Sequence, residues 1–376
     1  MKKTYSLILL LLVSFIAGNV LQAENTVRPG IEVLRDRGFD VLKGKKVGLV
    51  TNPSGVDSRL KSTIDILHEA PEVDLVALFG PEHGVRGDVY AGGKVEDAKD
   101  EATGLPVHSL YGSTRKPSPE MLEGIEVMVY DIQDVGVRSY TFISTLGLVM
   151  EACGERGIEV VVLDRPNPLG GNKIEGCVVE DGSFSFVSQY RIPYVYGLTV
   201  GELAMLVNEE GLNKGQKGNQ EHVKCQLTVV PMEGWTRDMV YEDTGLPWVL
   251  PSPNIPFKDT PMYYTSAGIC GELYGYLNIG IGYTLPFQVF GATWLDPDRL
   301  KEKLDGYGLP GISFRTIWFK PFSGSQKGQL VKGLQYFFTD YVRVEFSKRY
   351  KVSDIIDYWR KDEDSFRALS QRYHIY

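Results

Sequence analysis

Three stretches decide the fold of this chain: VDLVALFGPEHGVRGD (residues 73–88), IEVMVYDIQDVGVRSY (125–140) and IEVVVLDRPNPLGG (158–171). Each begins with a short apolar run, which is typical of a strand buried on both faces, and continues into a polar loop. Segments with helical apolar spacing alternate with these strands. Alternating strands and helices indicate βαβ units, so we predict an α/β fold built on a parallel sheet.

The chain has 376 residues, which is long enough for two cores. Residues 213–220 are rich in glycine, lysine, asparagine and glutamine, as boundary loops often are. Beyond them, shorter mixed elements replace the regular alternation. We therefore predict a parallel-sheet domain over residues 24–220 and a smaller α+β domain over 221–376. Thr199 and Glu202 have the spacing of a capping box, which predicts the start of a helix.

Residues 1–23 have the features of a secretory signal peptide. Lys2 and Lys3 precede an apolar run over residues 7–16, and Ala23 is a small residue suited to cleavage. The run is shorter than the roughly 20 residues that span a bilayer. We predict export to the periplasm without stable membrane insertion after cleavage; a retained anchor is the alternative.

Composition argues against several kinds of partner. The net charge is −8 and no run is rich in Lys and Arg, so we do not expect nucleic acid binding. The loop after the first predicted strand, TNPSGVD, lacks the G-x-G-x-x-G spacing that binds a dinucleotide. The four cysteines match no zinc-binding spacing. We therefore expect neither an organic cofactor nor a metal.

Polar side chains follow the three strands at their carboxyl ends. In open α/β sheets these ends meet at one edge, and ligands bind there. We expect the following residues along this rim: Glu82, His83, Arg86, Asp88, Asp131, Gln133, Asp134, Arg138, Tyr140, Asp164 and Asn167. Carboxylates with positive charges beside them indicate chemistry on a polar substrate.

Glu82 is the candidate general acid. It comes directly after a strand, in an irregular loop that Pro81, Gly84 and Gly87 constrain. Carboxylic acids can act as general acids where burial favours the protonated form; capping a helix is the alternative role. We expect His83 to form hydrogen bonds rather than to bind a metal.

Several other candidates have two possible roles. Arg138 offers a planar fork for a carboxylate, or it could pair with an aspartate of its own loop. Asn167 could orient a hydroxyl or an N-acetyl group, or it could stiffen a proline-rich turn. Arg165 and Arg191 are further candidates for binding an anion. The aromatic segments at 190–197, 247–256 and 261–268 could form a sugar-stacking wall or could pack at a domain junction.

Four of these motifs together resemble the exo-β-N-acetylmuramidase family, long known only as a domain of unknown function. They are GPEHGVRGD, YDIQDVGVRSYTF, LDRPNPLGG and GYTLPFQVFGATWLD, and the resemblance extends over residues 28–376. It implies a Rossmann-like catalytic domain, a smaller auxiliary domain, and release of N-acetylmuramic acid from non-reducing ends of peptidoglycan fragments. By motif match, Glu82 takes the position of the family's catalytic glutamate, and Asp88 falls where many members carry a second acid. GIGYT at 280–284 and KGLQ at 332–335 depart from the G-R-G-T and Cys-Gly-Gly-Val stretches of many members.

The sequence thus predicts a glycoside hydrolase that acts on muramyl glycans. Glycoside cleavage needs an acid at the leaving oxygen and a second group at the sugar carbon. Asp88, Asp134 or the acetamido oxygen of the sugar itself could be that second group, and Arg138 or Arg86 could bind the lactyl carboxylate. A non-catalytic glycan-binding protein on the same scaffold is the alternative function. An amidase or esterase is disfavoured because no G-x-S-x-G motif is present.

Overall fold

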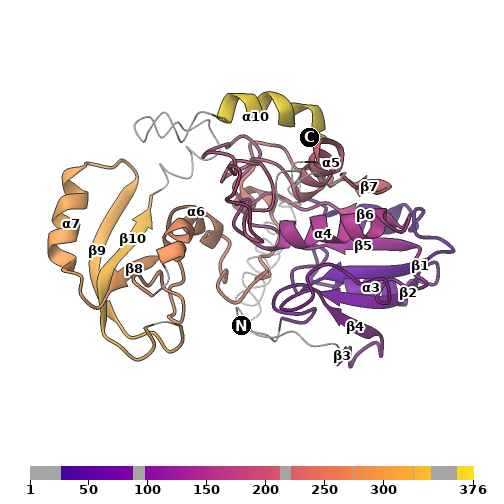
Figure 1. Ribbon diagram of the computed structural model, residues 1–376, viewed down its shortest axis with the longest axis horizontal. Coiled ribbons are helices and arrows are strands. Elements are labelled where there is room, and N and C mark those ends of the chain that lie inside the picture. The colour runs from indigo at the N-terminus through magenta and orange to yellow at the C-terminus, as the bar shows by residue number, and fades with distance from the viewer. Residues whose placement is uncertain (1–26, 88–97, 212–221, 274, 325, 340–361) are drawn as a thin grey trace, which may run out of the picture.

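A computed structural model of the chain describes residues 27–87, 98–211, 222–273, 275–324, 326–339 and 362–376 (Figure 1). Its largest element is a seven-stranded sheet in the order β3-β4-β2-β1-β5-β6-β7. The strands are β1 (Lys46–Thr51), β2 (Asp74–Gly80), β3 (Ala98–Lys99), β4 (Pro106–Ser109), β5 (Val127–Asp131), β6 (Glu159–Leu163) and β7 (Leu227–Val230). β3 is antiparallel to β4, and the other neighbours are parallel. The predicted parallel sheet is therefore confirmed.

Helices cover both faces of this sheet. On one face, Leu34 of α2 (Gly30–Asp36) and Ile64 of α3 (Thr63–Glu69) join an apolar cluster with Leu49 of β1. On the other face, Leu146 of α4 (Phe142–Gly154) joins a cluster with Met128 of β5. The central strands are apolar throughout because both faces are covered.

Helix α5 (Val200–Glu210) begins with the predicted capping box. The Thr199 hydroxyl accepts from the backbone N–H of Glu202 at 3.2 Å, and the Thr199 N–H donates to the Glu202 carboxylate at 3.0 Å. These bonds satisfy two helix-end groups that would otherwise lack partners.

A second, antiparallel sheet has the order β8-β10-β9, formed by β8 (Val289–Ala292), β9 (Ile312–Phe319) and β10 (Val331–Phe338). Figure 1 shows α6 (Thr260–Cys270) between the two sheets and α7 (Pro297–Gly306) beside β9. Tyr263 of α6 packs edge-on against Tyr336 of β10, with 5.4 Å between ring centroids. The predicted fold class, a parallel-sheet unit followed by a smaller α+β unit, is confirmed.

The large sheet extends past the division that we predicted at residue 220, because β7 pairs with β6. Helix α10 (Glu363–Ser370) also returns to this part of the molecule, where Phe366 packs with Leu203 and Leu206 of α5. The described part of the chain also contains the short helices η1 (Tyr241–Thr244), η2 (Gly271–Leu273) and η3 (Gln371–Tyr373). The predicted signal peptide, Asp88 and the whole of the predicted boundary loop lie outside the described residues. Among the helices that are described, none is long and apolar enough to cross a membrane.

Candidate active site

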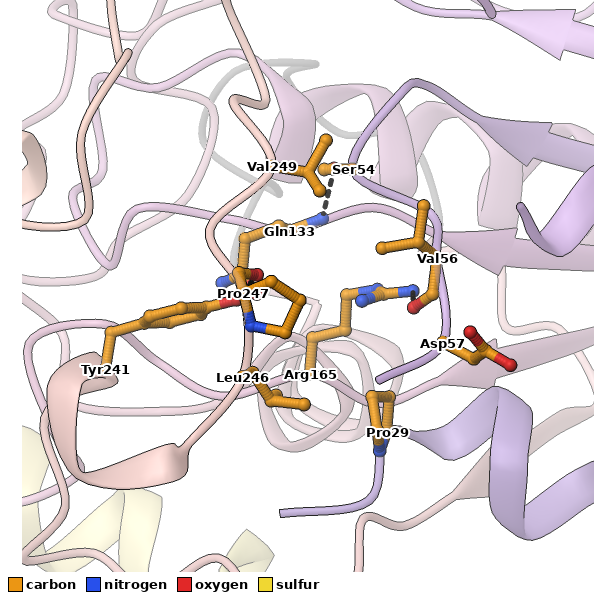
Figure 2. Close-up of a pocket in the computed structure, with 10 residues that line it drawn as sticks. All are labelled: Pro29, Ser54, Val56, Asp57, Gln133, Arg165, Tyr241, Leu246, Pro247 and Val249. Atoms are coloured by element: carbon orange, nitrogen blue, oxygen red, sulfur yellow. Dashed lines mark hydrogen bonds between the residues drawn. The ribbon is translucent and has the colours of Figure 1, made fainter. Parts of the chain in front are cut away.

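The strand order reverses between β1 and β5, where α/β sheets usually bind ligands. Loops from the carboxyl ends of β1, β5 and β6 meet there, and residues from 241–249 form a facing wall (Figure 2). The residues that line this pocket are Pro29, Ser54, Val56, Asp57, Gln133, Arg165, Tyr241, Leu246, Pro247 and Val249. Asn52 ties the β1 loop to the facing wall, because its amide donates to the Pro251 carbonyl at 3.0 Å.

Two candidate residues at this pocket hold the loops together. The Gln133 side chain donates to the carbonyl of Pro166 at 2.7 Å, and its backbone N–H donates to Ser54 at 3.0 Å (Figure 2). Asp131 is buried and forms an ion pair with buried Arg165, with 2.9 Å between Nη2 and Oδ2. Asp131 thus makes an aspartate–arginine pair, but its partner comes from the loop after β6 rather than from its own loop.

Glu82 lies elsewhere on the rim, in the loop after β2. The hydroxyl of Thr141 donates to its Oε2 atom at 2.8 Å. His83 is buried and, like Gly84, has a left-handed backbone, with φ of 77° and 75°. Non-glycine residues seldom adopt this conformation, and such strain concentrates at functional sites.

Tyr111, in the loop after β4, lies against Glu82. Burial raises the pKa of its hydroxyl to about 12, and the charge and hydrogen bond of Glu82 add to the rise. Arg115 acts in the opposite direction, so its positive charge is close to the same hydroxyl. Glu82 therefore has hydroxyl neighbours from two separate segments.

Asp134 is a second carboxyl group of unusual character. It is buried, and its Oδ2 atom accepts from the N–H of Gly136 at 2.7 Å and from the hydroxyl of Tyr196. Within the described part of the chain, its Oδ1 atom is buried without a hydrogen-bond partner. Burial raises the pKa of Asp134 from 3.8 to about 6, although the bonds from Tyr196 and Gly136 oppose the rise.

An aromatic pair lies close to both acids. Tyr140 packs edge-on against Tyr264 of α6, with 5.9 Å between ring centroids. Burial raises the pKa of both tyrosines, and the negative charges of Asp134 and Glu82 contribute to both shifts. The charges of Glu82 and Asp134 thus both act on the pair formed by Tyr140 and Tyr264. Two carboxyl groups beside aromatic rings suit the cleavage of a sugar bond.

The candidate arginines are engaged with other groups. Arg86 binds Asp100 through two bonds of 2.8 and 2.9 Å, which hold the pKa of Asp100 down at about 2. Arg138 donates to the backbone carbonyls of Cys177 and Ile192 at 2.7 and 2.6 Å. The fork of Arg86 is thus occupied by Asp100, whereas Arg138 is held through Nη1 alone, and its Nε atom is buried without a hydrogen-bond partner among the described residues.

Asn167 serves a turn, which is the alternative role we considered. Its amide donates to the Leu198 carbonyl and accepts from the Leu169 N–H, both at 2.9 Å. No three His, Cys, Asp or Glu side chains among the described residues gather as metal ligands would.

Two residues at the site were absent from our sequence candidates, Thr141 and Tyr111, whereas Tyr264 belongs to the predicted aromatic segment 261–268. Thr141 lies directly before α4, and its contact with Glu82 bridges 59 positions of sequence. A pattern within a short stretch of sequence cannot predict such a contact.

The sequence and structure are similar to known proteins. Models of the family "Exo-beta-N-acetylmuramidase NamZ" match residues 47–259 with the N-terminal part and 262–347 with the C-terminal part. The peptidoglycan beta-N-acetylmuramidase NamZ of Bacillus subtilis (strain 168) is 46% identical over 322 residues, which cover 86% of this chain and 75% of that protein. A crystal structure of a DUF1343 family protein from Bacteroides fragilis NCTC 9343 has a TM-score of 0.82 at 47% identity, covering 94% of this chain and all of the other. A second DUF1343 protein from that organism has a TM-score of 0.72 at 28% identity, covering 93% and 99%.

Proposed function

This chain belongs to the exo-β-N-acetylmuramidase NamZ family, and from that premise we propose that it releases N-acetylmuramic acid from non-reducing ends of peptidoglycan fragments. The position of Glu82 carries the proposal. This carboxyl group follows a central strand, is oriented by Thr141 at 2.8 Å, and shares an aromatic neighbourhood with Asp134.

In the proposed reaction Glu82 gives its proton to the glycosidic oxygen as the bond from that oxygen to the sugar carbon breaks. A water oxygen finally bonds to the same carbon and loses its proton. We assign the second carboxyl role to Asp134, since its pKa of about 6 leaves it mostly ionised at neutral pH and its Oδ1 atom has no partner among the described residues. Attack by the acetamido oxygen of the sugar, with Asp134 orienting the amide, is the substrate-assisted form of this reaction. Asp88 is the other candidate and lies outside the described residues.

The test is Glu82→Gln, which keeps the shape of the side chain and removes the proton that it donates. We expect release of muramic acid from a natural disaccharide to fall by about 10²-fold or more. Glu69→Gln is a matched control, because Glu69 lies at the exposed end of α3 and pairs with Lys61. Undiminished release by Glu82→Gln would rule out the acid role. No release by the unmodified protein would leave the non-catalytic glycan-binding function.

We also propose that residues 1–23 direct export to the periplasm, where peptidoglycan is found. Lys2, Lys3 and the apolar run that follows support this proposal. Sequencing the N-terminus of protein recovered from the periplasm should give a chain that begins at Glu24. A full-length protein that stays in the cytoplasmic fraction would contradict it.

A further inference from the structure

A muramidase needs a positive charge in its binding site. N-acetylmuramic acid differs from N-acetylglucosamine by a lactyl ether, which adds one carboxylate. The protein carries a net charge of −8, so a local cation must offset the repulsion of that group. Each arginine that the sequence suggested for this task already binds a carboxylate or backbone carbonyls: Arg86, Arg138, Arg165 and Arg191.

Arg115 differs from these four. It lies in the segment after β4, its side chain is exposed, and within the described residues it forms no ion pair. Its guanidinium carbon lies 4.2 Å from the centre of the Phe186 ring. Stacking on an aromatic face limits the movement of a guanidinium while leaving its N–H edge open to a carboxylate.

Arg115 is also close to the candidate acid. The Leu110 N–H donates to the Gly80 carbonyl at 2.8 Å, so the segment that carries Arg115 leaves β4 beside the loop of Glu82. The charges of Arg115 and Glu82 both act on the hydroxyl of Tyr111 in this segment. A sugar whose glycosidic oxygen lies at Glu82 would therefore have Arg115 within the reach of its substituents. Phe186 lies outside the aromatic segments that the sequence suggested as a wall, which begin at residue 190.

We propose that Arg115, stacked on Phe186, binds the lactyl carboxylate and so selects muramyl over glucosaminyl sugars. The proposal rests on the proposed hydrolase function and adds the residue that determines its specificity. A charge-assisted bidentate contact of this kind changes affinity by about 10- to 150-fold. Because Arg115 is exposed, solvent screening places the expected effect near the lower end.

The experiment compares matched glycosides of N-acetylmuramic acid and N-acetylglucosamine. Arg115→Met should lower kcat/KM for the muramide by about 10-fold, mainly through KM, and leave the glucosaminide unchanged. Arg115→Lys should keep part of the preference, because a lysine offers charge without the planar fork. Raising the salt concentration should weaken the preference of the unmodified protein and have little effect on Arg115→Met.

Arg191→Met is the matched control. Arg191 also lies over a phenylalanine, with 5.0 Å to the Phe184 ring centre, but it is paired with Asp181. This variant should keep the full preference. An unchanged preference in Arg115→Met, or an equal loss on both sugars, would overturn the proposal.

Calorimetry on the Glu82→Gln protein separates this proposal from the hydrolase function. N-acetylmuramic acid should bind about 10-fold more tightly than N-acetylglucosamine, and Arg115→Met should abolish the difference. Equal binding of the two sugars would refute the role of Arg115 even if hydrolysis were confirmed. A difference that depends on Arg115 would support it even if no hydrolysis were found.

Discussion

Replacing Thr141 with valine removes one hydrogen bond to Glu82 and leaves the shape of the side chain nearly unchanged. The lost bond is the one from the Thr141 hydroxyl to Oε2, at 2.8 Å. Thr141 is the N-cap residue of α4, but its side chain makes no capping bond. The substitution should therefore avoid the usual loss of about 1 kcal/mol that follows removal of a helix cap.

The magnitude follows from the kind of bond and from its exposure. A hydrogen bond to a charged group contributes about 1.5–3 kcal/mol where it is well buried. Glu82 and Thr141 are both partly exposed, so water replaces part of the lost interaction. We expect a loss of about 1–2 kcal/mol in transition-state stabilisation, which is roughly a 5- to 30-fold lower kcat/KM.

The assay is release of N-acetylmuramic acid from a natural disaccharide, with urea denaturation of the same samples. Thr141→Ser keeps the hydroxyl and should stay within about 3-fold of the unmodified protein. Thr141→Val should unfold within about 0.5 kcal/mol of it. Wild-type turnover in Thr141→Val would refute the orienting role. A loss of activity that matches a loss of stability would show that the residue only supports the fold.

Three further predictions concern the buried groups around the site. Gly136→Ala should lower the free energy of unfolding, measured by urea denaturation, by about 2–4 kcal/mol. The φ angle of Gly136 is 77°, and a new β-carbon would come 2.3 Å from Oδ1 of Asn167. A change below about 0.5 kcal/mol would contradict this prediction. Tyr376→Phe should lower the free energy of unfolding by about 1.5–3 kcal/mol, because the lost hydroxyl donates at 2.7 Å to the buried carboxylate of Asp164. An unchanged denaturation midpoint would disprove this prediction. Burial raises the pKa of Asp134 from 3.8 to about 6, so its contribution to stability is complete below about pH 4 and is lost as the pH rises through about 6. Asp134→Asn should therefore flatten the decline of Tm between about pH 4 and 6, and an equally steep decline would show that another group titrates.

Local pattern predicted the framework of the large sheet. Apolar runs marked β2, β5 and β6, and the spacing of Thr199 and Glu202 marked the start of α5. Such features depend on residues a few positions apart, where the period of a helix or strand fixes which side chains meet. The position of Glu82 after a strand could be seen for the same reason.

The partners of the charged groups could not be predicted in this way. Arg86 was a candidate for the substrate carboxylate, but the fold brings Asp100 against it. Asp131 meets Arg165 from another loop, 34 positions away in the sequence. A buried charge takes whichever opposite charge the tertiary packing places beside it, and spacing along the chain does not determine that choice.

The amino-acid sequence by itself determined the parallel sheet, its smaller companion and the edge at which polar loops gather, because apolar periodicity and helix capping act over short distances. Only the tertiary structure decided which side chains remain available at that edge. It engaged all four of the expected arginines with other groups, placed Thr141 and Tyr111 near Glu82, and left Arg115 stacked on Phe186 without an ion pair among the described residues. These outcomes depend on contacts between distant segments, which form only when the sheet and its loops pack together.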